Sequence, residues 1–475
     1  MKARHLMAAT VAGLLSLPLA GPGYAQESVE GSWTGAILVL GGELGMSVHF
    51  TRSDSALIAT MDIPQQGAAK LALRNVRVEP PKVHFELLGG PGLAVFDGEL
   101  QGDSISGSFE QSGVNGTFWL RPAAAAAAEL EPAAPPPYRE EEVGFANGDV
   151  TLAGTLTVPE GPGPHPAVVL ITGSGPQNRD EEIFGFKPFR LIADHLTRNG
   201  IAVLRYDDRG VGGSSGSVQT ATSDDFANDA LAAVALLQAR PDIGRDAVGL
   251  LGHSEGALVA PIASGRSKDV AFLVLLAGTA VPGDRILLAQ GQLILKANGG
   301  TPEQLERQRR LQEEIFAAIR ADTGWEAVRH EIETQIRESI DALPPEQRDR
   351  ISDLDTFVQT RAQQQILGVQ SPWFRFFLDF DPVAALRRVR GPVLAVFGET
   401  DLQVPPTLNV GPMNDALAAA GNRDYTVRVL PGMNHLFQAS ETGNPSEYAS
   451  LKKEFAPGFL ELVSNWIRER TASIR

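Results

Sequence analysis

The segment Val248-Gly249-Leu250-Leu251-Gly252-His253-Ser254-Glu255-Gly256 leads from an apolar stretch into a serine with a glycine two residues before it and another two residues after it. The apolar part has the length of a buried strand, and the small residues from Ala257 to Ser264 predict a helix. A chain that turns this sharply from strand to helix needs glycines beside the turn, because larger side chains would collide there. The turn exposes the serine hydroxyl, so the segment predicts that Ser254 is a nucleophile.

A serine hydroxyl is a weak nucleophile unless a neighbouring base takes its proton, and histidine is the usual base. Of the eight histidines in the chain, His435 is the one in a loop after a late apolar strand, Tyr425 to Leu430. His253 adjoins the serine and is expected to point into the fold as a packed core imidazole. The sequence therefore predicts that His435 is the base.

The acid that orients the imidazole is expected in the turn after the preceding strand, Val393 to Phe397. Asp401 is the first choice in this turn, because a carboxylate there reaches the imidazole and holds its tautomer. Glu399 is the alternative, since the acid can also come from a neighbouring turn position. The resulting order is Ser254, Asp401, His435.

Stabilising a tetrahedral oxyanion needs two hydrogen-bond donors. The backbone N–H of Glu255 is one candidate, because it directly follows the nucleophile at a helix N-terminus. The backbone N–H of Ser174 is the other, in the glycine-rich turn Gly173-Ser174-Gly175-Pro176 that follows an early strand. A phosphate cradle is the alternative for this turn, but no Lys-Ser sequence follows it.

Residues 140–475 alternate apolar strands with helical segments, which predicts a mostly parallel sheet with helices on both faces. From about residue 284 to residue 381 only helical patterns occur, and Thr301-Pro302-Glu303-Gln304 is a capping box. We expect this insertion to form a helical cap. Its last segment holds Trp373, Phe374 and Phe377, which either line the substrate pocket or simply pack the cap on the sheet.

The N-terminal part, residues 1–139, has a different sequence pattern. Residues 1–25 combine basic residues, an apolar run and a small-residue cleavage site, which predicts a signal peptide and a periplasmic or secreted protein. Residues 27–121 alternate apolar and polar side chains between turn residues, which predicts a small all-β barrel or sandwich of roughly eight strands. Residues 122–139, rich in alanine and proline, are expected to be a linker.

Composition excludes several classes of protein. The net charge of −16 argues against a nucleic-acid surface. The chain has no cysteine, which excludes disulfides, thiolate nucleophiles and cysteine-ligated metals. After the apolar N-terminal run, no segment is long and apolar enough to span a membrane. We expect neither a cofactor nor a metal.

Three motifs resemble the serine-aminopeptidase-like branch of the α/β hydrolases, to which secreted bacterial esterases belong. They are the oxyanion segment at residues 172–180, the glycine-rich turn at residues 205–214 and the histidine loop Met433-Asn434-His435-Leu436-Phe437. This branch usually has His-Gly before the oxyanion turn, whereas this chain has Thr172-Gly173, which keeps the backbone donor. We interpret the turn around Arg209 as structural.

The resemblance and the three predicted catalytic residues together indicate hydrolysis of a small-molecule carboxylic ester, with short to medium acyl groups, through an acyl-enzyme. A peptidase or amidase with the same residues is one alternative, in which Glu313, Glu314 and Glu331 of the cap would bind a substrate amino group. A cell-envelope binding protein with an inactive hydrolase fold is another. The sequence does not say what the β-domain binds.

Overall fold

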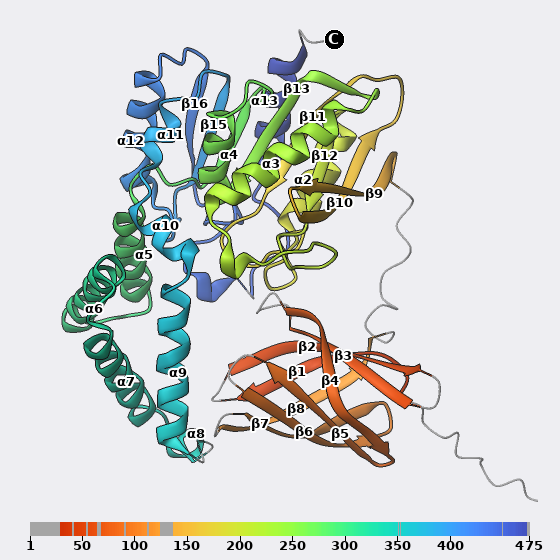
Figure 1. Cartoon of the computed structure of the whole chain (residues 1–475), viewed down its shortest axis with the longest axis vertical. Coiled ribbons are helices and arrows are strands. Elements are labelled where there is room, and N and C mark those ends of the chain that lie inside the picture. The colour runs from red at the N-terminus through yellow and green to blue at the C-terminus, as the bar shows by residue number, and fades with distance from the viewer. Residues whose placement is uncertain are drawn as a thin grey trace, which may run out of the picture.

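The computed structural model describes residues 29–472 except 40–41, 54–55, 64–67, 90–91, 112–113, 124–135, 350, 352 and 449. The expected signal peptide and most of the expected linker lie outside these residues. Figure 1 shows two strand-rich parts, a barrel formed by the earlier residues and a sheet with helices formed by the later ones. Among the helices of the described residues, none has both the length and the apolarity of a membrane span.

The first part is a closed eight-stranded antiparallel barrel, in which β1 pairs with β8 to complete the ring. Alternate side chains point inward, and the inward set includes Phe50, Phe85, Phe96 and Phe118. Phe85 and Phe96 stack with ring centroids 4.7 Å apart. These rings fill the barrel with side chains, as is usual for a barrel of this size. The strands are β1 (Gly31–Val39), β2 (Gly42–Ser53), β3 (Ala56–Ile63), β4 (Ala68–Glu79), β5 (Lys82–Gly89), β6 (Gly92–Gln101), β7 (Ser104–Gln111) and β8 (Val114–Pro122).

The second part contains an eight-stranded sheet in the order β16-β15-β14-β13-β11-β12-β10-β9. Strands β11 to β16 are parallel, whereas β9 and β10 form an antiparallel hairpin that pairs with β12. The central strands are apolar along their whole length because helices cover both of their faces. The bounds are β9 (Tyr138–Asn147), β10 (Val150–Pro159), β11 (His165–Ile171), β12 (Ala202–Tyr206), β13 (Ile243–His253), β14 (Leu273–Leu276), β15 (Val393–Gly398) and β16 (Tyr425–Leu430).

Helices α3 and α4 pack on one face of this sheet, and α2 and α13 on the other (Figure 1). This mostly parallel sheet between helices confirms the fold class expected from the sequence, together with the all-β part that precedes it. The helices are α2 (Pro188–Arg198), α3 (Ser223–Gln238), α4 (Gly256–Ser264), α11 (Pro382–Leu386), α12 (Pro406–Ala419) and α13 (Phe459–Thr471).

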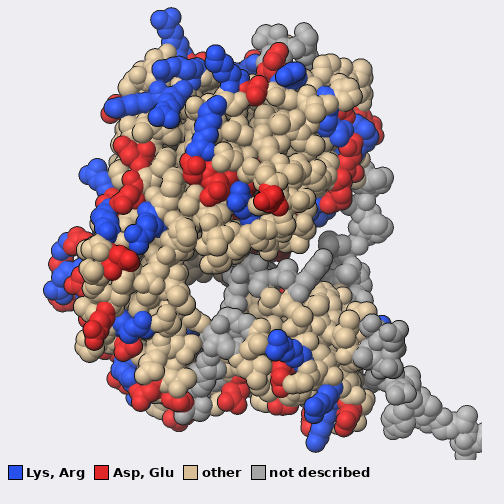
Figure 2. Space-filling model, in the orientation of Figure 1, with Lys and Arg blue, Asp and Glu red and all other residues tan. Residues whose placement is uncertain are grey.

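The helical insertion lies between β14 and β15. Its second helix begins at the predicted capping box, where the Thr301 N–H donates to Gln304 Oε1 at 2.8 Å. The insertion has a small apolar core of its own, formed by Ala318, Val328, Ile332, Ala362 and Ile366. Positively charged lysine and arginine side chains and negatively charged carboxylates are interspersed over its outer face (Figure 2). Its helices are α5 (Gly283–Ala297), α6 (Pro302–Ala321), α7 (Trp325–Asp341), α8 (Pro345–Arg348), α9 (Leu354–Val369) and α10 (Pro372–Asp379).

Three consecutive carboxylates of β9 join the antiparallel hairpin to the rest of the sheet through ion pairs. Arg205 binds Glu140 at 3.1 Å and Arg240 binds Glu141 at 2.9 Å. Glu142 pairs with Arg179 at 2.6 Å. Arg179 also binds the buried Asp207 at 2.8 Å, so these charges link β9 to the turn after β12.

Candidate active site

The turn between β13 and α4 holds Ser254 in a backbone conformation that non-glycine residues rarely adopt, with φ of 54°. The Ser254 N–H donates to the carbonyl of Leu276 at 2.8 Å, which anchors the turn to β14. A Cβ on Gly252 would lie 2.0 Å from the carbonyl oxygen of Gly256, and one on Gly256 would lie 2.1 Å from that of Ile171. Both glycines are therefore required by close backbone approach, as the motif predicts.

His435 and Asp401 meet behind the serine. His435 lies in the loop after β16, and its Nδ1 is 2.8 Å from Asp401 Oδ2. The other carboxylate oxygen, Oδ1, accepts the backbone N–H groups of Gln403 at 2.8 Å and Val404 at 2.9 Å. Asp401 is 2% exposed and His435 is 4% exposed, so solvent does not compete for this contact. The carboxylate is thus held from one side by the backbone and presents its free oxygen to the imidazole.

Glu399, the alternative acid, points elsewhere. Its side chain is exposed, and its Oε2 accepts the N–H of Gly432 at 2.9 Å. It makes no contact with His435 within the part of the chain that the structure describes. The geometry therefore favours Asp401 as the partner of the imidazole.

The two expected oxyanion donors come from different segments, since Ser174 follows β11 and Glu255 directly precedes α4. Neither the N–H of Ser174 nor that of Glu255 has a hydrogen-bond acceptor among the described residues. The loop that carries Ser174 is fixed on both sides, because Glu181 Oε1 accepts the Gly173 N–H at 2.6 Å and Asp208 accepts the Gln177 N–H at 2.8 Å. Two free amides on a fixed backbone beside a serine can stabilise an oxyanion.

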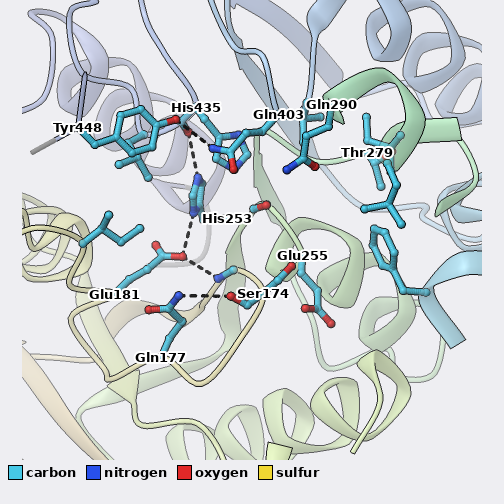
Figure 3. Close-up of a pocket in the computed structure, with 18 of the residues that line it drawn as sticks. Ser174, Gln177, Glu181, His253, Glu255, Thr279, Gln290, Gln403, His435 and Tyr448 are labelled. Carbon is cyan, nitrogen blue, oxygen red and sulfur yellow. Dashed lines mark hydrogen bonds and ion pairs between the residues drawn. The ribbon is translucent and has the colours of Figure 1, made fainter. Parts of the chain in front are cut away.

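A cavity of about 400 Å³ opens over Ser254 and is shown in Figure 3. The candidate residues that line it are Ser174, Ser254, Glu255, Trp373, Phe377 and His435. Ser254 and His435 make no direct hydrogen bond within the described structure, and such bonds often tighten only when substrate binds. Phe374 does not line the cavity, because its ring faces Phe316 in the cap with centroids 6.5 Å apart. The cap also contributes Ile286 and Leu287 of α5.

The side chain of Glu255 binds to both the core and the cap. Its Oε1 accepts the Ser223 hydroxyl and the indole N–H of Trp373, each at 2.6 Å. Burial raises the pKa of the Glu255 carboxyl above its usual value. Trp373 also stacks on Phe377, with ring centroids 5.2 Å apart. This tryptophan is therefore at once a wall of the cavity and a packed residue, and its bond to Glu255 had no signal in the sequence.

Two further side chains of the cavity also escaped sequence reasoning. Gln403 donates to the Tyr448 hydroxyl at 2.9 Å, and both line the cavity beside His435. Burial is the main reason that the pKa of Tyr448 lies well above its usual value. Tyr448 is thus a neutral hydroxyl whose proton is available to a ligand.

His253 lies behind Ser254 as expected, but it is not a simple packing residue. Its Nδ1 is 2.9 Å from Glu181 Oε1, and its Nε2 is 3.0 Å from the carbonyl oxygen of His435. Figure 3 shows this chain of contacts running through His253 to Glu181. Glu181 lies 72 positions earlier in the chain, so no local pattern could have indicated the pair.

The cap carboxylates do not reach the cavity. Glu313 pairs with Arg309 at 2.5 Å and Glu331 with Arg307 at 2.7 Å, while Glu314 is exposed. None of these three carboxylates lines the cavity. The arrangement gives no support to recognition of a substrate amino group by these residues.

The glycine-rich turn after β12 has a structural role, as expected. Arg209 donates two hydrogen bonds to Asp229 of α3, at 2.7 and 2.9 Å, and Asp229 is 2% exposed. Arg209 does not line the cavity over Ser254. Within the described residues, no group of three or more histidine and carboxylate side chains is arranged to hold a metal ion.

Comparison with known proteins finds a matching family and several similar proteins. Residues 168–451, which are 284 of the 475, match the profile described as Alpha/beta hydrolase family, and the match includes Ser254, Asp401 and His435. Esterase EstD from Thermotoga maritima is 29% identical over 336 residues, which are 70% of this chain and 69% of that protein. A solved proline iminopeptidase from Mycobacterium smegmatis is 18% identical with a TM-score of 0.43, covering 70% of this chain and 100% of its own. The Pyrococcus furiosus esterase Pf2001 is 17% identical with a TM-score of 0.43, covering 72% and 96%.

Proposed function

Because the chain belongs to the alpha/beta hydrolase family, we propose that it is a serine carboxylesterase that cleaves short to medium acyl esters through an acyl-enzyme. The observation that carries the proposal is that one cavity is lined by Ser254, His435 and the two residues, Ser174 and Glu255, whose backbone N–H groups have no acceptor among the described residues. The likeness to an esterase over 70% of the chain supports the ester class of substrate.

In the proposed reaction His435 takes the proton of Ser254 Oγ as that oxygen bonds to the ester carbonyl carbon. The N–H groups of Ser174 and Glu255 hold the negative charge that develops on the carbonyl oxygen. The intermediate collapses by breaking the bond to the alcohol oxygen, which receives the proton from His435. Asp401 keeps the imidazole oriented and stabilises its cationic form, as its 2.8 Å contact with Nδ1 allows.

Water then completes the cycle. His435 takes a proton from the water as its oxygen attacks the acyl carbon, and the same amides hold the second oxyanion. The serine leaves with the proton returned by His435, which releases the carboxylic acid.

The preference for compact acyl groups rests on the cavity. Its volume of about 400 Å³ lies toward the small end of ligand pockets. Trp373 and Phe377 wall it on the cap side, together with Ile286 and Leu287 of α5. Each methylene that these side chains bury is worth ~0.8 kcal/mol, until the acyl chain outgrows the space.

Two substitutions test the proposed function. Ser254→Ala and His435→Ala should each lower the turnover of p-nitrophenyl acetate by about 10⁴-fold or more, because such groups act as a unit. Circular dichroism and thermal unfolding should show that both variants are folded. Turnover within tenfold of wild type in either folded variant would refute the assignment.

We also propose that the protein is exported to the periplasm or the medium. The support is the pattern of basic, apolar and small residues within residues 1–25. The measurement is the mass of the protein purified from the periplasmic fraction of a bacterial host. A mature chain that starts near Gln26 is expected, and an uncleaved chain retained in the cytoplasm would contradict the proposal.

A further inference from the structure

The imidazole of His253 has a hydrogen-bond partner at each ring nitrogen. Its Nε2 faces the backbone carbonyl of His435 at 3.0 Å, and a carbonyl only accepts, so Nε2 must carry a proton. Its Nδ1 faces Glu181 Oε1 at 2.9 Å. The pair is therefore either neutral at both residues or an ion pair, depending on whether the proton between Nδ1 and Oε1 belongs to the glutamate or to the histidine.

A second donor at the same carboxylate oxygen indicates which residue holds this proton. The backbone N–H of Gly173 also donates to Glu181 Oε1, at 2.6 Å. An oxygen that accepts two N–H groups is best served by the ionised carboxylate, since charge strengthens both bonds and makes them short. The proton then lies on Nδ1, and both nitrogens of His253 are protonated.

The surroundings favour this charge state. His253 is 5% exposed and Glu181 is 1% exposed, so each charge has its partner rather than water as its main source of stabilisation. Desolvation opposes the cation, but the charges of Glu181 and Asp401 and the hydrogen bonds to Glu181 and the His435 carbonyl outweigh it and raise the pKa of His253. The titratable groups that face the imidazole are Glu181, Asp401 and His435, whose ring centroid lies 4.8 Å away.

We propose that His253 and Glu181 form a buried imidazolium–carboxylate pair that positions the base loop and the oxyanion loop around Ser254. The pair joins three separate segments, because Glu181 holds Gly173, His253 belongs to the strand that leads into the nucleophile, and its Nε2 holds the backbone of His435. The inference rests on the proposed function, in which His435 and Ser174 act on the substrate. His253 and Glu181 are positioning residues.

Three substitutions separate the contacts of this pair. In His253→Gln the amide nitrogen can replace Nε2 and keep the bond to His435, but the charged bond to Glu181 is lost. In His253→Asn the amide nitrogen can replace Nδ1 and keep the bond to Glu181, but the hold on His435 is lost. In Glu181→Gln the oxygen can still accept the Gly173 N–H, but it has no charge to stabilise the imidazolium.

The kinetic test measures kcat for p-nitrophenyl acetate and the rate of labelling by a fluorophosphonate. We expect each of the three variants to lose about 10- to 100-fold in both quantities, because small displacements of catalytic groups have effects of this size. His195→Gln is the matched control, since His195 contacts Ser464 at 3.0 Å and does not line the cavity. The control should remain within twofold of wild type. A merely structural pair would lower the temperature of unfolding and leave both rates of the folded protein unchanged.

The charge itself is tested by NMR of the full chain labelled with ¹⁵N-histidine. Wild type should show one histidine with both ring nitrogens protonated at pH 7, assigned by its disappearance in His253→Gln. In Glu181→Gln that histidine should become neutral at the same pH. Wild-type rates in all three variants, or a neutral His253 in wild type at pH 7, would overturn the proposal, and the spectrum of wild type decides even if a variant fails to fold.

The two proposals fail in different ways. If Ser254→Ala keeps its turnover, the proposed function is wrong and the kinetic arm tests nothing about the pair, although the spectrum of His253 still does. If Ser254→Ala is inactive while the His253 and Glu181 variants are fully active, the serine mechanism stands and the positioning role is wrong.

Discussion

Asp401→Asn should abolish most of the activity, for a reason that can be worked out from the hydrogen bonds. Asp401 Oδ1 accepts two backbone N–H groups, from Gln403 and Val404, while Oδ2 accepts the Nδ1 proton of His435. The asparagine oxygen must take the place of Oδ1, because an NH₂ group there would face two donors. Its NH₂ group then points at His435 Nδ1, so Nδ1 must lose its proton and accept a hydrogen bond from the amide. The proton moves to Nε2, and the imidazole can no longer take the proton of Ser254.

The size of the effect follows from the alternative orientation. Turning the amide around would restore the tautomer but leave the part-buried Gln403 N–H and the buried Val404 N–H without an acceptor, at about 1–3 kcal/mol each. The productive orientation is therefore disfavoured by roughly 2–6 kcal/mol, and at 1.36 kcal/mol per factor of ten kcat should fall by roughly 30-fold to 3 × 10⁴-fold.

The assay is steady-state hydrolysis of p-nitrophenyl acetate by Asp401→Asn, with Glu399→Gln as the control. Glu399 is an exposed carboxylate in the same turn, and its one hydrogen bond to a described residue is with the Gly432 N–H, so the control should keep kcat within about threefold. Thermal unfolding should show that both variants are folded. The reasoning is refuted if folded Asp401→Asn keeps more than a tenth of the wild-type kcat, or if the control carries the larger loss.

Four further predictions address other parts of the chain. Trp373→Ala should move the optimum of kcat/KM to longer acyl chains, with kcat/KM rising about fourfold for each added methylene that the enlarged cavity buries. A lower melting temperature with an unchanged chain-length profile would show that the ring only packs. A chain truncated to begin just before Tyr138 should be soluble and active on p-nitrophenyl acetate, and insolubility would mean that the barrel is needed for folding. Gly256→Ala places a Cβ 2.1 Å from the Ile171 carbonyl, so urea unfolding should show a loss of about 3 kcal/mol, whereas an unchanged midpoint would contradict the close approach. Burial raises the pKa of Glu255, so the stability that its protonation contributes is present at low pH and is lost as pH rises through the folded pKa. Glutamine does not titrate, so calorimetry from pH 4 to pH 9 should find the melting temperature of Glu255→Gln rising relative to that of wild type. A constant difference between the two melting temperatures would count against the pKa shift.

The sequence was most informative where chemistry and backbone geometry are local. The glycines around Ser254 are dictated by contacts within one turn, and the place of His435 and Asp401 after successive strands follows from the order of elements in a parallel sheet. The barrel could be predicted as an all-β unit, because alternation along a strand reveals a half-buried face. Alternation alone does not say whether the sheet closes, and closure appears only in the pairing of β1 with β8.

The contacts that the sequence could not indicate join residues far apart in the chain. Glu181 and His253 are 72 positions apart, and Trp373 and Glu255 are 118 apart, so neither pair has a fixed spacing to recognise. Phe374 was grouped with Trp373 because the two are adjacent, yet successive residues of a helix point in different directions. One ring faces the cavity and the other faces the cap. The antiparallel direction of β9 and β10 was likewise hidden, because strand patterns carry no sign of direction.

The charged strand β9 has a consequence for how the protein behaves at high concentration. A strand at the border of an open sheet offers unpaired backbone groups to any other extended chain, and charged side chains along such a border discourage that pairing. The barrel has no border at all, since its ring is closed. Strand β9 is the last strand of the open sheet, and it presents Glu140, Glu141 and Glu142 in succession. Each of these carboxylates pairs with an arginine, so two molecules approaching through this border would bring rows of charged side chains of both signs together. Charged side chains on a border strand discourage pairing, so the residues that tie the hairpin to the sheet also protect the folded protein against edge-to-edge aggregation.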